Sequence, residues 1–158
     1  MLDPRIDLYC HQFKRLKRAN HIAPHKPILL ISVCQAIGGR IIAAPFFTAL
    51  PELVALFRYN WSLYVDTAHN PVFTLPFTKM DSEPFWKIVL NPGYQAINIR
   101  KVDIKSFNTL QQMISGVQLD AALFDLLQDR GQRVYMFVFG AAVFSGQILR
   151  GVSGWRWF

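Results

Sequence analysis

The chain has 158 residues, of which 52% are hydrophobic and 14% aromatic, and it carries a formal net charge of +7. A chain of this length is expected to form one domain with a sizeable core, and its composition excludes an intrinsically disordered protein. Because the longest uncharged apolar run, Val134 to Ser145, is too short to span a bilayer and no signal-peptide pattern opens the chain, we expect a cytoplasmic protein without a membrane segment.

The first predicted helix begins after Asp3 and Pro4, which give an N-cap and first-turn signal. Apolar residues then recur at helical spacing for about four turns. The opposite side of this helix carries basic residues three or four positions apart: His11, Lys14, Arg15 and Arg18. Residues 1–26 hold six Lys or Arg against two acids, and residues 129–158 hold four against one. This distribution fits a polyanion-binding surface built from both ends, and equally an ordinary solvated surface.

Two more helices are predicted before residue 66. After a loop over residues 20–26, the apolar residues 27–37 predict a helix that is buried on all sides and ends at Gly38-Gly39. Pro51 then starts an amphipathic helix over residues 51–65. Cys10 and Cys34 lie within these apolar patterns without CxxC spacing, so we expect buried free thiols and no zinc site.

The middle of the chain predicts a β-hairpin. Phe77 to Met80 and Phe85 to Leu90 have strand composition and are separated by the turn sequence DSEP, while Pro76 limits the first strand to a sheet edge. Further helices are predicted near residues 104–110, 119–127 and 132–144. The expected fold class is therefore α+β: a predominantly helical single domain with a small antiparallel β-hairpin, a core over residues 5–145 and an irregular tail over residues 146–158.

The segment APHKP, residues 23–27, predicts an anion site. Pro24 and Pro27 flank His25 and Lys26 and hold them in a restricted conformation at the start of a helix. A helix N-terminus offers free backbone N–H groups and the positive end of the helix dipole, and Lys26 adds a charge. These features together favour binding of a phosphate-like anion.

The sequence contains one loose match to a catalytic motif. The four histidines have no metal-ligand spacing, and no nucleophile or glycine-rich phosphate loop is recognisable, so no metal or other cofactor is predicted. Asp81 with Asp103 and Lys105 loosely matches a D…DxK arrangement, in which carboxylates bind Mg²⁺ and a lysine orients water. A metal-dependent nuclease is therefore the alternative function, although a turn residue and a helix cap explain the two aspartates more simply. A third alternative is a general nucleic-acid or protein-interaction domain that uses the basic first helix and the final WRWF.

Two motifs in order, APHKPILLISV and LPFTKMDSEPFWKI, resemble the DNA sulfur-binding domain of McrA-type, phosphorothioation-dependent HNH restriction endonucleases. That family binds duplex DNA in which sulfur replaces one non-bridging phosphate oxygen. The resemblance implies that His25 and Lys26, with Pro24, contact the modified backbone. It also implies a sulfur pocket with walls from Leu75, Pro76, Thr78 and Lys79, and we expect further backbone contacts from Lys14, Arg15, Arg18 and His21. Because members commonly continue into an HNH nuclease and this chain ends at Phe158, we expect a stand-alone reader, a truncated relative, or a recognition subunit whose nuclease is on a separate chain.

The chemistry of a phosphorothioate agrees with such a site. The group keeps its negative charge, but sulfur is larger, more polarisable and more weakly hydrated than oxygen. Burying a phosphate oxygen against Leu75 and Pro76 leaves it without a hydrogen bond, at a cost of about 1 to 3 kcal/mol. Sulfur largely avoids this cost, so an apolar wall beside a cation favours the modified backbone.

Overall fold

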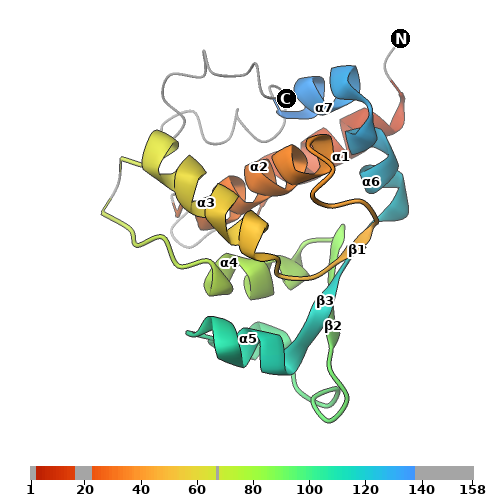
Figure 1. Cartoon of the computed structure of the whole chain (residues 1–158). Helices are drawn as coiled ribbons and strands as arrows, with labels where there is room; N and C mark the ends of the chain where they lie inside the picture. The colour runs from red at the N-terminus through yellow and green to blue at the C-terminus, as the bar shows by residue number, and fades with distance from the viewer. Residues whose placement is uncertain (1–2, 17–22, 67, 138–158) are drawn as a thin grey trace.

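The computed structural model describes residues 3–16, 23–66 and 68–137. Figure 1 shows helices packed around one central helix, α2, with a small sheet below and to the right of it. In chain order the helices are α1 (Arg5–Lys14), α2 (His25–Gly38), α3 (Pro51–Tyr64), α4 (Thr74–Lys79), α5 (Phe107–Met113), α6 (Ala121–Gln128) and α7 (Arg130–Met136), with short 3₁₀ helices η2 (Met80–Ser82) and η3 (Ile99–Lys101). The predicted α+β, mostly helical single domain is confirmed.

Helix α2 is the centre of the hydrophobic core, as its apolar sequence predicts. Every residue from Lys26 to Ile37 is buried, because α3, α4, α6 and α7 all pack against this helix. Asn60 of α3 also bonds to α2 through its side-chain amide, which donates to Ser32 Oγ at 2.9 Å and to Gln35 Oε1 at 2.6 Å. The helix ends at Gly38, where the sequence predicts its end. It begins two residues earlier than predicted, at His25.

The sheet has the strand order β1-β3-β2, and both pairings are antiparallel. The strands are β1 (Phe46–Phe47), β2 (Trp86–Leu90) and β3 (Ile114–Leu119). Gly116 lies at the centre of β3, where a Cβ atom would come within 2.5 Å of the Phe47 carbonyl oxygen and 2.7 Å of the Phe46 ring. Glycine is therefore required for the close approach of β1 to β3.

The predicted hairpin is wrong, although its second strand exists as β2. The segment predicted as the first strand is helical, since α4 ends at Lys79 and continues into η2, and β2 pairs instead with β3. Pro76 is the third residue of α4, where a backbone N–H would have no partner within the helix. Proline therefore fits the first turn of this helix as well as it fits a strand edge. Pro27 occupies the same position in α2, which explains the early start of that helix.

The other predictions for the second half are partly confirmed. Helix α6 lies within one or two residues of its predicted bounds, whereas α5 is shifted by about three residues and β3 was not predicted. Helix α7 begins near the expected residue, and its predicted continuation to residue 144 lies outside the described residues, as does the tail at 146–158. Cys10 and Cys34 are buried and free, and burial raises the pKa of the Cys34 thiol to about 12. No helix in the described part of the chain is long and apolar enough to cross a membrane.

Candidate nucleic-acid interface

The two sequence motifs lie side by side in the fold. The ammonium group of Lys26, in the first turn of α2, donates to Ser82 Oγ at 3.1 Å and to Glu83 Oε2 at 2.8 Å. Both belong to the second motif: Ser82 is the last residue of η2, the 3₁₀ helix after α4, and Glu83 follows it. A buried ion pair thus joins segments that are 57 residues apart in the sequence.

This ion pair gives Lys26 a structural role. Lys26 is 8% exposed and Glu83 is 5% exposed, and the charge of the ammonium group is matched by the carboxylate. Contact between Lys26 and a DNA phosphate would require the ion pair to open. Lys26 and Glu83 together therefore add no net charge to this part of the molecule.

His25 lies at the first position of α2 and is half-buried. Its Nε2 atom donates to the carbonyl oxygen of Asn70 at 2.8 Å, because a carbonyl oxygen only accepts. The imidazole also contacts Trp61, with ring centroids 4.8 Å apart, and His69, with centroids 5.8 Å apart. Burial lowers the pKa of His25, the hydrogen bond to the Asn70 carbonyl oxygen partly opposes this effect, and the nearby His69 lowers the pKa further. Its Nδ1 atom is therefore a hydrogen-bond acceptor at neutral pH and becomes a donor only after protonation.

This pKa shift predicts a loss of stability in mild acid. Below pH 6.5 the unfolded chain protonates His25 more readily than the folded protein does, so the free energy of unfolding falls as the pH drops from about 6.5 through the lowered pKa. His25→Phe keeps an aromatic ring and removes the titration, so its melting temperature should depend less on pH in this window. Thermal melts between pH 5 and pH 7.5 measure the difference, with His11→Phe, at an exposed position, as the control. An identical pH dependence in wild type and His25→Phe would contradict the prediction.

The four residues predicted to form the sulfur pocket differ in their exposure. Pro76 and Thr78 are buried, and the Thr78 hydroxyl donates to the Thr74 carbonyl oxygen at 3.0 Å within α4. Leu75 and Lys79 are partly exposed. Leu75 is therefore the apolar side chain of α4 that reaches the surface, and Pro84, later in the motif, is exposed as well. Pro24, in the first motif, is buried at the N-cap of α2.

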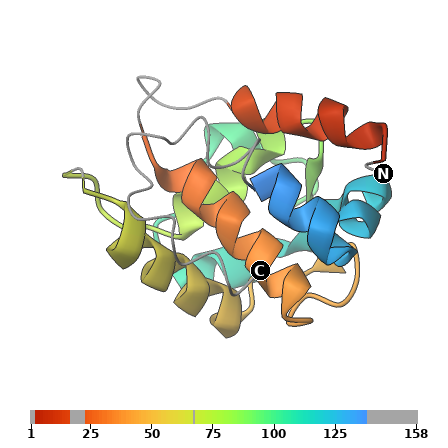
Figure 2. The same cartoon turned by 90° about the horizontal axis from the view of Figure 1, so that it is seen from above.

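Two of the four predicted backbone-contact residues are described by the structure, and both lie at one end of α1. Lys14 and Arg15 are exposed at the C-terminal end of the helix, and His11 is exposed one turn earlier. Figure 2 shows this end of α1 on the same side of the molecule as the start of α2. Arg18 and His21, predicted for the same role, lie outside the described residues. The basic end of α1 and the first motif therefore face the same region.

Acidic residues collect at the opposite end of α1. Asp3 and Asp7 lie at or near its start, where Arg5 also comes within 4.0 Å of Asp125 in α6. Asp120, just before α6, accepts a hydrogen bond from Tyr9 at 3.2 Å. Exposed charge thus differs between the two ends of α1, with acids gathered at its start and bases at its end.

The aspartates of the alternative nuclease motif are engaged in separate ion pairs. Asp81 accepts from Arg100 Nε at 2.9 Å and from the Ile88 backbone N–H at 2.9 Å. Asp103 pairs with Lys79 at 2.9 Å, and hydrogen bonding from this lysine lowers the pKa of Asp103. Among the described residues, no three His, Cys, Asp or Glu side chains are placed to hold a metal ion together. These contacts give the two acids a role in stabilising the loop around η3.

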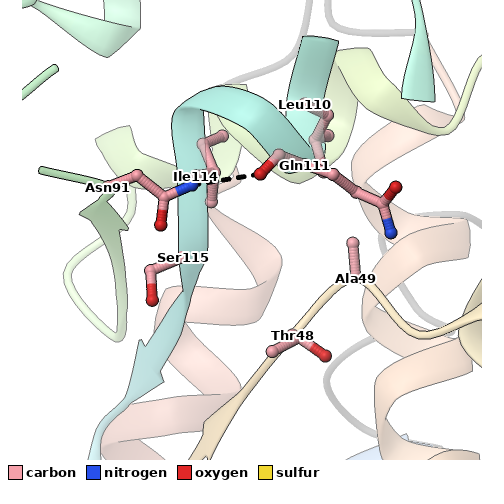
Figure 3. Close-up of a pocket in the computed structure, with 7 residues that line it drawn as sticks. All are labelled: Thr48, Ala49, Asn91, Leu110, Gln111, Ile114 and Ser115. Atoms are coloured by element: carbon pink, nitrogen blue, oxygen red, sulfur yellow. Dashed lines mark hydrogen bonds between the residues drawn. The ribbon is translucent and has the colours of Figure 1, made fainter. Parts of the chain in front are cut away.

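Two cavities in the described structure lie outside the predicted sulfur pocket. One, of about 300 Å³, opens between the end of β1 and the start of β3 (Figure 3). Its uncharged lining comprises Thr48, Ala49, Asn91, Leu110, Gln111, Ile114 and Ser115. The other, of about 490 Å³, lies beside β2 and is lined in part by Asp81, Lys87 and Arg100. Neither cavity is lined by Leu75 or His25.

The residues around the two motifs that sequence reasoning missed are Glu83, Trp61, His69 and Asn70. Glu83 lies inside the second motif as printed, so its charge was a visible signal for a partner such as Lys26. The spacing of Trp61, His69 and Asn70 gives no sign that they surround His25. No protein-family model matches this chain, and no curated protein matches it either. The resemblance to the DNA sulfur-binding domain therefore depends on the two motifs.

Proposed function

We propose that this chain binds duplex DNA whose backbone carries a phosphorothioate and acts as a reader or recognition subunit. The observation that supports this most is the meeting of the two motifs, which the Lys26–Glu83 ion pair holds together. Each motif alone has an ordinary structural explanation as a helix start or a turn. Their proximity in the fold is what a shared binding surface requires.

Attraction to the DNA backbone comes from the exposed cations at the end of α1. Lys14 and Arg15 serve any phosphate, because Coulomb attraction and counterion release do not depend on sequence or on sulfur. Lys26 contributes indirectly, since it fixes the first turn of α2 against the turn that follows α4. In this proposal the affinity for DNA comes from α1, and Lys26 maintains the geometry of the site.

Discrimination between sulfur and oxygen comes from Leu75. Its side chain reaches the surface from the first turn of α4, next to the buried Pro76. A non-bridging oxygen pressed against this leucine loses hydrogen bonds to water, whereas sulfur loses little. The modified duplex is therefore bound more tightly than the plain duplex.

Leu75→Ser is expected to reduce the preference for sulfur without removing DNA binding. The ratio of affinities for a duplex with one phosphorothioate and for the same plain duplex should fall by about fivefold, which corresponds to about 1 kcal/mol of apolar contact. Fluorescence anisotropy titrations over several flanking sequences measure this ratio. Leu63→Ser is the matched control, since Leu63 is a 46% exposed leucine on α3.

Three outcomes count against the proposal. Equal affinity of the wild-type protein for modified and plain DNA would rule out sulfur recognition. A full preference for sulfur in a folded Leu75→Ser variant would place the pocket elsewhere. The proposal assigns DNA cleavage to a separate chain, so cutting of either duplex with Mg²⁺ that disappears in Asp103→Ala would instead favour the nuclease alternative.

A further inference from the structure

The loop around η3, residues 98–105, is attached to α4 at several points. The Lys79 ammonium group donates to the carbonyl oxygens of Arg100 at 3.0 Å and Val102 at 3.2 Å. Thr74, at the other end of α4, donates to the Ile104 carbonyl oxygen at 2.7 Å. Helix α4, which carries Leu75, therefore holds this loop through hydrogen bonds from both of its ends.

Side chains at both ends of the loop also anchor it to the protein. Ile99 and Ile104 are buried in the core. Arg100 reaches back to η2, where its guanidinium group donates to Asp81 Oδ2 at 2.9 Å and to the Asp81 carbonyl oxygen at 2.8 Å. The backbone of the loop is thus held by contacts with α4, η2 and the core, which fixes where its exposed side chains begin.

Those outward side chains carry excess positive charge. Around α4 and η3, the cations Lys79, Arg100, Lys101 and Lys105 face the acids Asp81 and Asp103. Lys79 pairs with Asp103, and Arg100 pairs with Asp81. Lys101 and Lys105 are exposed, and neither takes part in an ion pair among the residues that the structure describes. The local balance is therefore two positive charges in excess.

We infer that the η3 loop is a second contact with the DNA backbone, in which Lys101 and Lys105 each neutralise one phosphate. The inference rests on the proposed function, because the loop is held by α4, the helix of the proposed sulfur pocket. DNA seated on α4 presents neighbouring phosphates to the loop. The contact is electrostatic and carries no preference for sulfur, in contrast to the role of Leu75.

The test is the salt dependence of DNA binding by Lys101→Ala/Lys105→Ala. Each lost phosphate contact reduces the slope of log affinity against log salt by about 0.9, so the slope should become shallower by about 1.8. A fourfold rise in salt then weakens the variant about tenfold less than it weakens the wild type. Affinity should fall by the same factor for modified and plain duplexes. Arg58→Ala/Arg130→Ala removes two exposed cations from α3 and α7 and should keep the wild-type slope.

The outcomes separate this inference from the proposed function. An unchanged slope in a variant that melts like wild type overturns the loop contact, even if the sulfur preference is present. An equal change in the control variant also overturns it, because the effect would then be one of net charge. A shallower slope in a protein that shows no sulfur preference supports the loop contact and rejects sulfur recognition. A wild-type protein that binds neither duplex overturns both.

Discussion

Replacing Glu83 by alanine is expected to lower the free energy of unfolding by about 3 to 5 kcal/mol, because it leaves a buried ammonium group without its carboxylate. Lys26 Nζ lies 2.8 Å from Glu83 Oε2, and both side chains are almost fully buried. The loss is a large fraction of the stability of an ordinary domain. Urea denaturation followed by circular dichroism measures it.

A double variant distinguishes the ion pair from the packing of the two side chains. Lys26→Met/Glu83→Leu removes both charges and keeps apolar volume, so it should be much more stable than Glu83→Ala. Asp103→Ala breaks the exposed ion pair with Lys79 and should change stability little. The expectation fails if Glu83→Ala is as stable as wild type, or if Lys26→Met/Glu83→Leu is no more stable than Glu83→Ala.

The second large effect is expected at Trp86, the first residue of β2. Its side chain is 2% exposed, and its ring packs edge-on against Phe47 at 5.6 Å and Phe77 at 5.7 Å. The indole N–H donates to the Phe77 carbonyl oxygen at 3.0 Å, which fastens α4 to the sheet. Trp86→Ala should therefore lower the free energy of unfolding by about 3 to 5 kcal/mol.

Trp86→Phe isolates the hydrogen bond from the packing. Phenylalanine retains much of the aromatic contact but leaves the Phe77 carbonyl oxygen without its donor, so a smaller loss of about 1 to 3 kcal/mol is expected. Tyr59→Ala, at a 54% exposed aromatic position on α3, should change stability by about 0.5 kcal/mol or less. Urea denaturation curves measure the free energy of unfolding of each variant. A Trp86→Phe variant as stable as wild type would show that the indole hydrogen bond does not hold α4.

Both effects connect stability with the proposed site. Lys26–Glu83 joins α2 to the turn after α4, and Trp86 joins α4 to β2. Variants that break either the Lys26–Glu83 ion pair or the Trp86–Phe77 contact should therefore shift the position of Leu75 relative to the start of α2. Milder changes that leave the protein folded, such as Trp86→Phe, are expected to weaken the preference for sulfur more than the salt-dependent attraction to DNA.

Local signals in the sequence correctly predicted much of the helical structure. The unbroken apolar run at residues 27–37 predicted a helix buried on all sides, and the glycines after it predicted its end. Pro51 marked the start of α3 for the same local reason, since proline fits the first turn of a helix. Such signals act within a few residues, so a single sequence contains all the information they need.

Pairing in the sheet depends on contacts between distant residues, and the local pattern misled the prediction there. Pro76 suits a strand edge and the first turn of a helix equally well, and in the folded protein the helix is held by distant contacts such as the packing of Phe77 against Trp86. Strand β3 follows α5 without a loop and contains an irregularity opposite Val89 and Leu90, so its alternation was hard to see. The partner of β2 was therefore decided by the tertiary structure.

For the candidate site too, some features follow from the sequence alone and others depend on the tertiary structure. The sequence by itself determined which residue types the two motifs carry: a histidine and a lysine at a helix start, and an apolar Leu-Pro-Phe segment before an acidic turn. Only the tertiary structure decided that Glu83 neutralises Lys26. It also decided that Pro76 and Thr78 are buried while Leu75 reaches the surface. Finally, it decided that Asp81 and Asp103 pair with different cations. The physical reason is that charge neutralisation and burial depend on which side chains meet in space, and residues 57 positions apart meet only when the chain has folded.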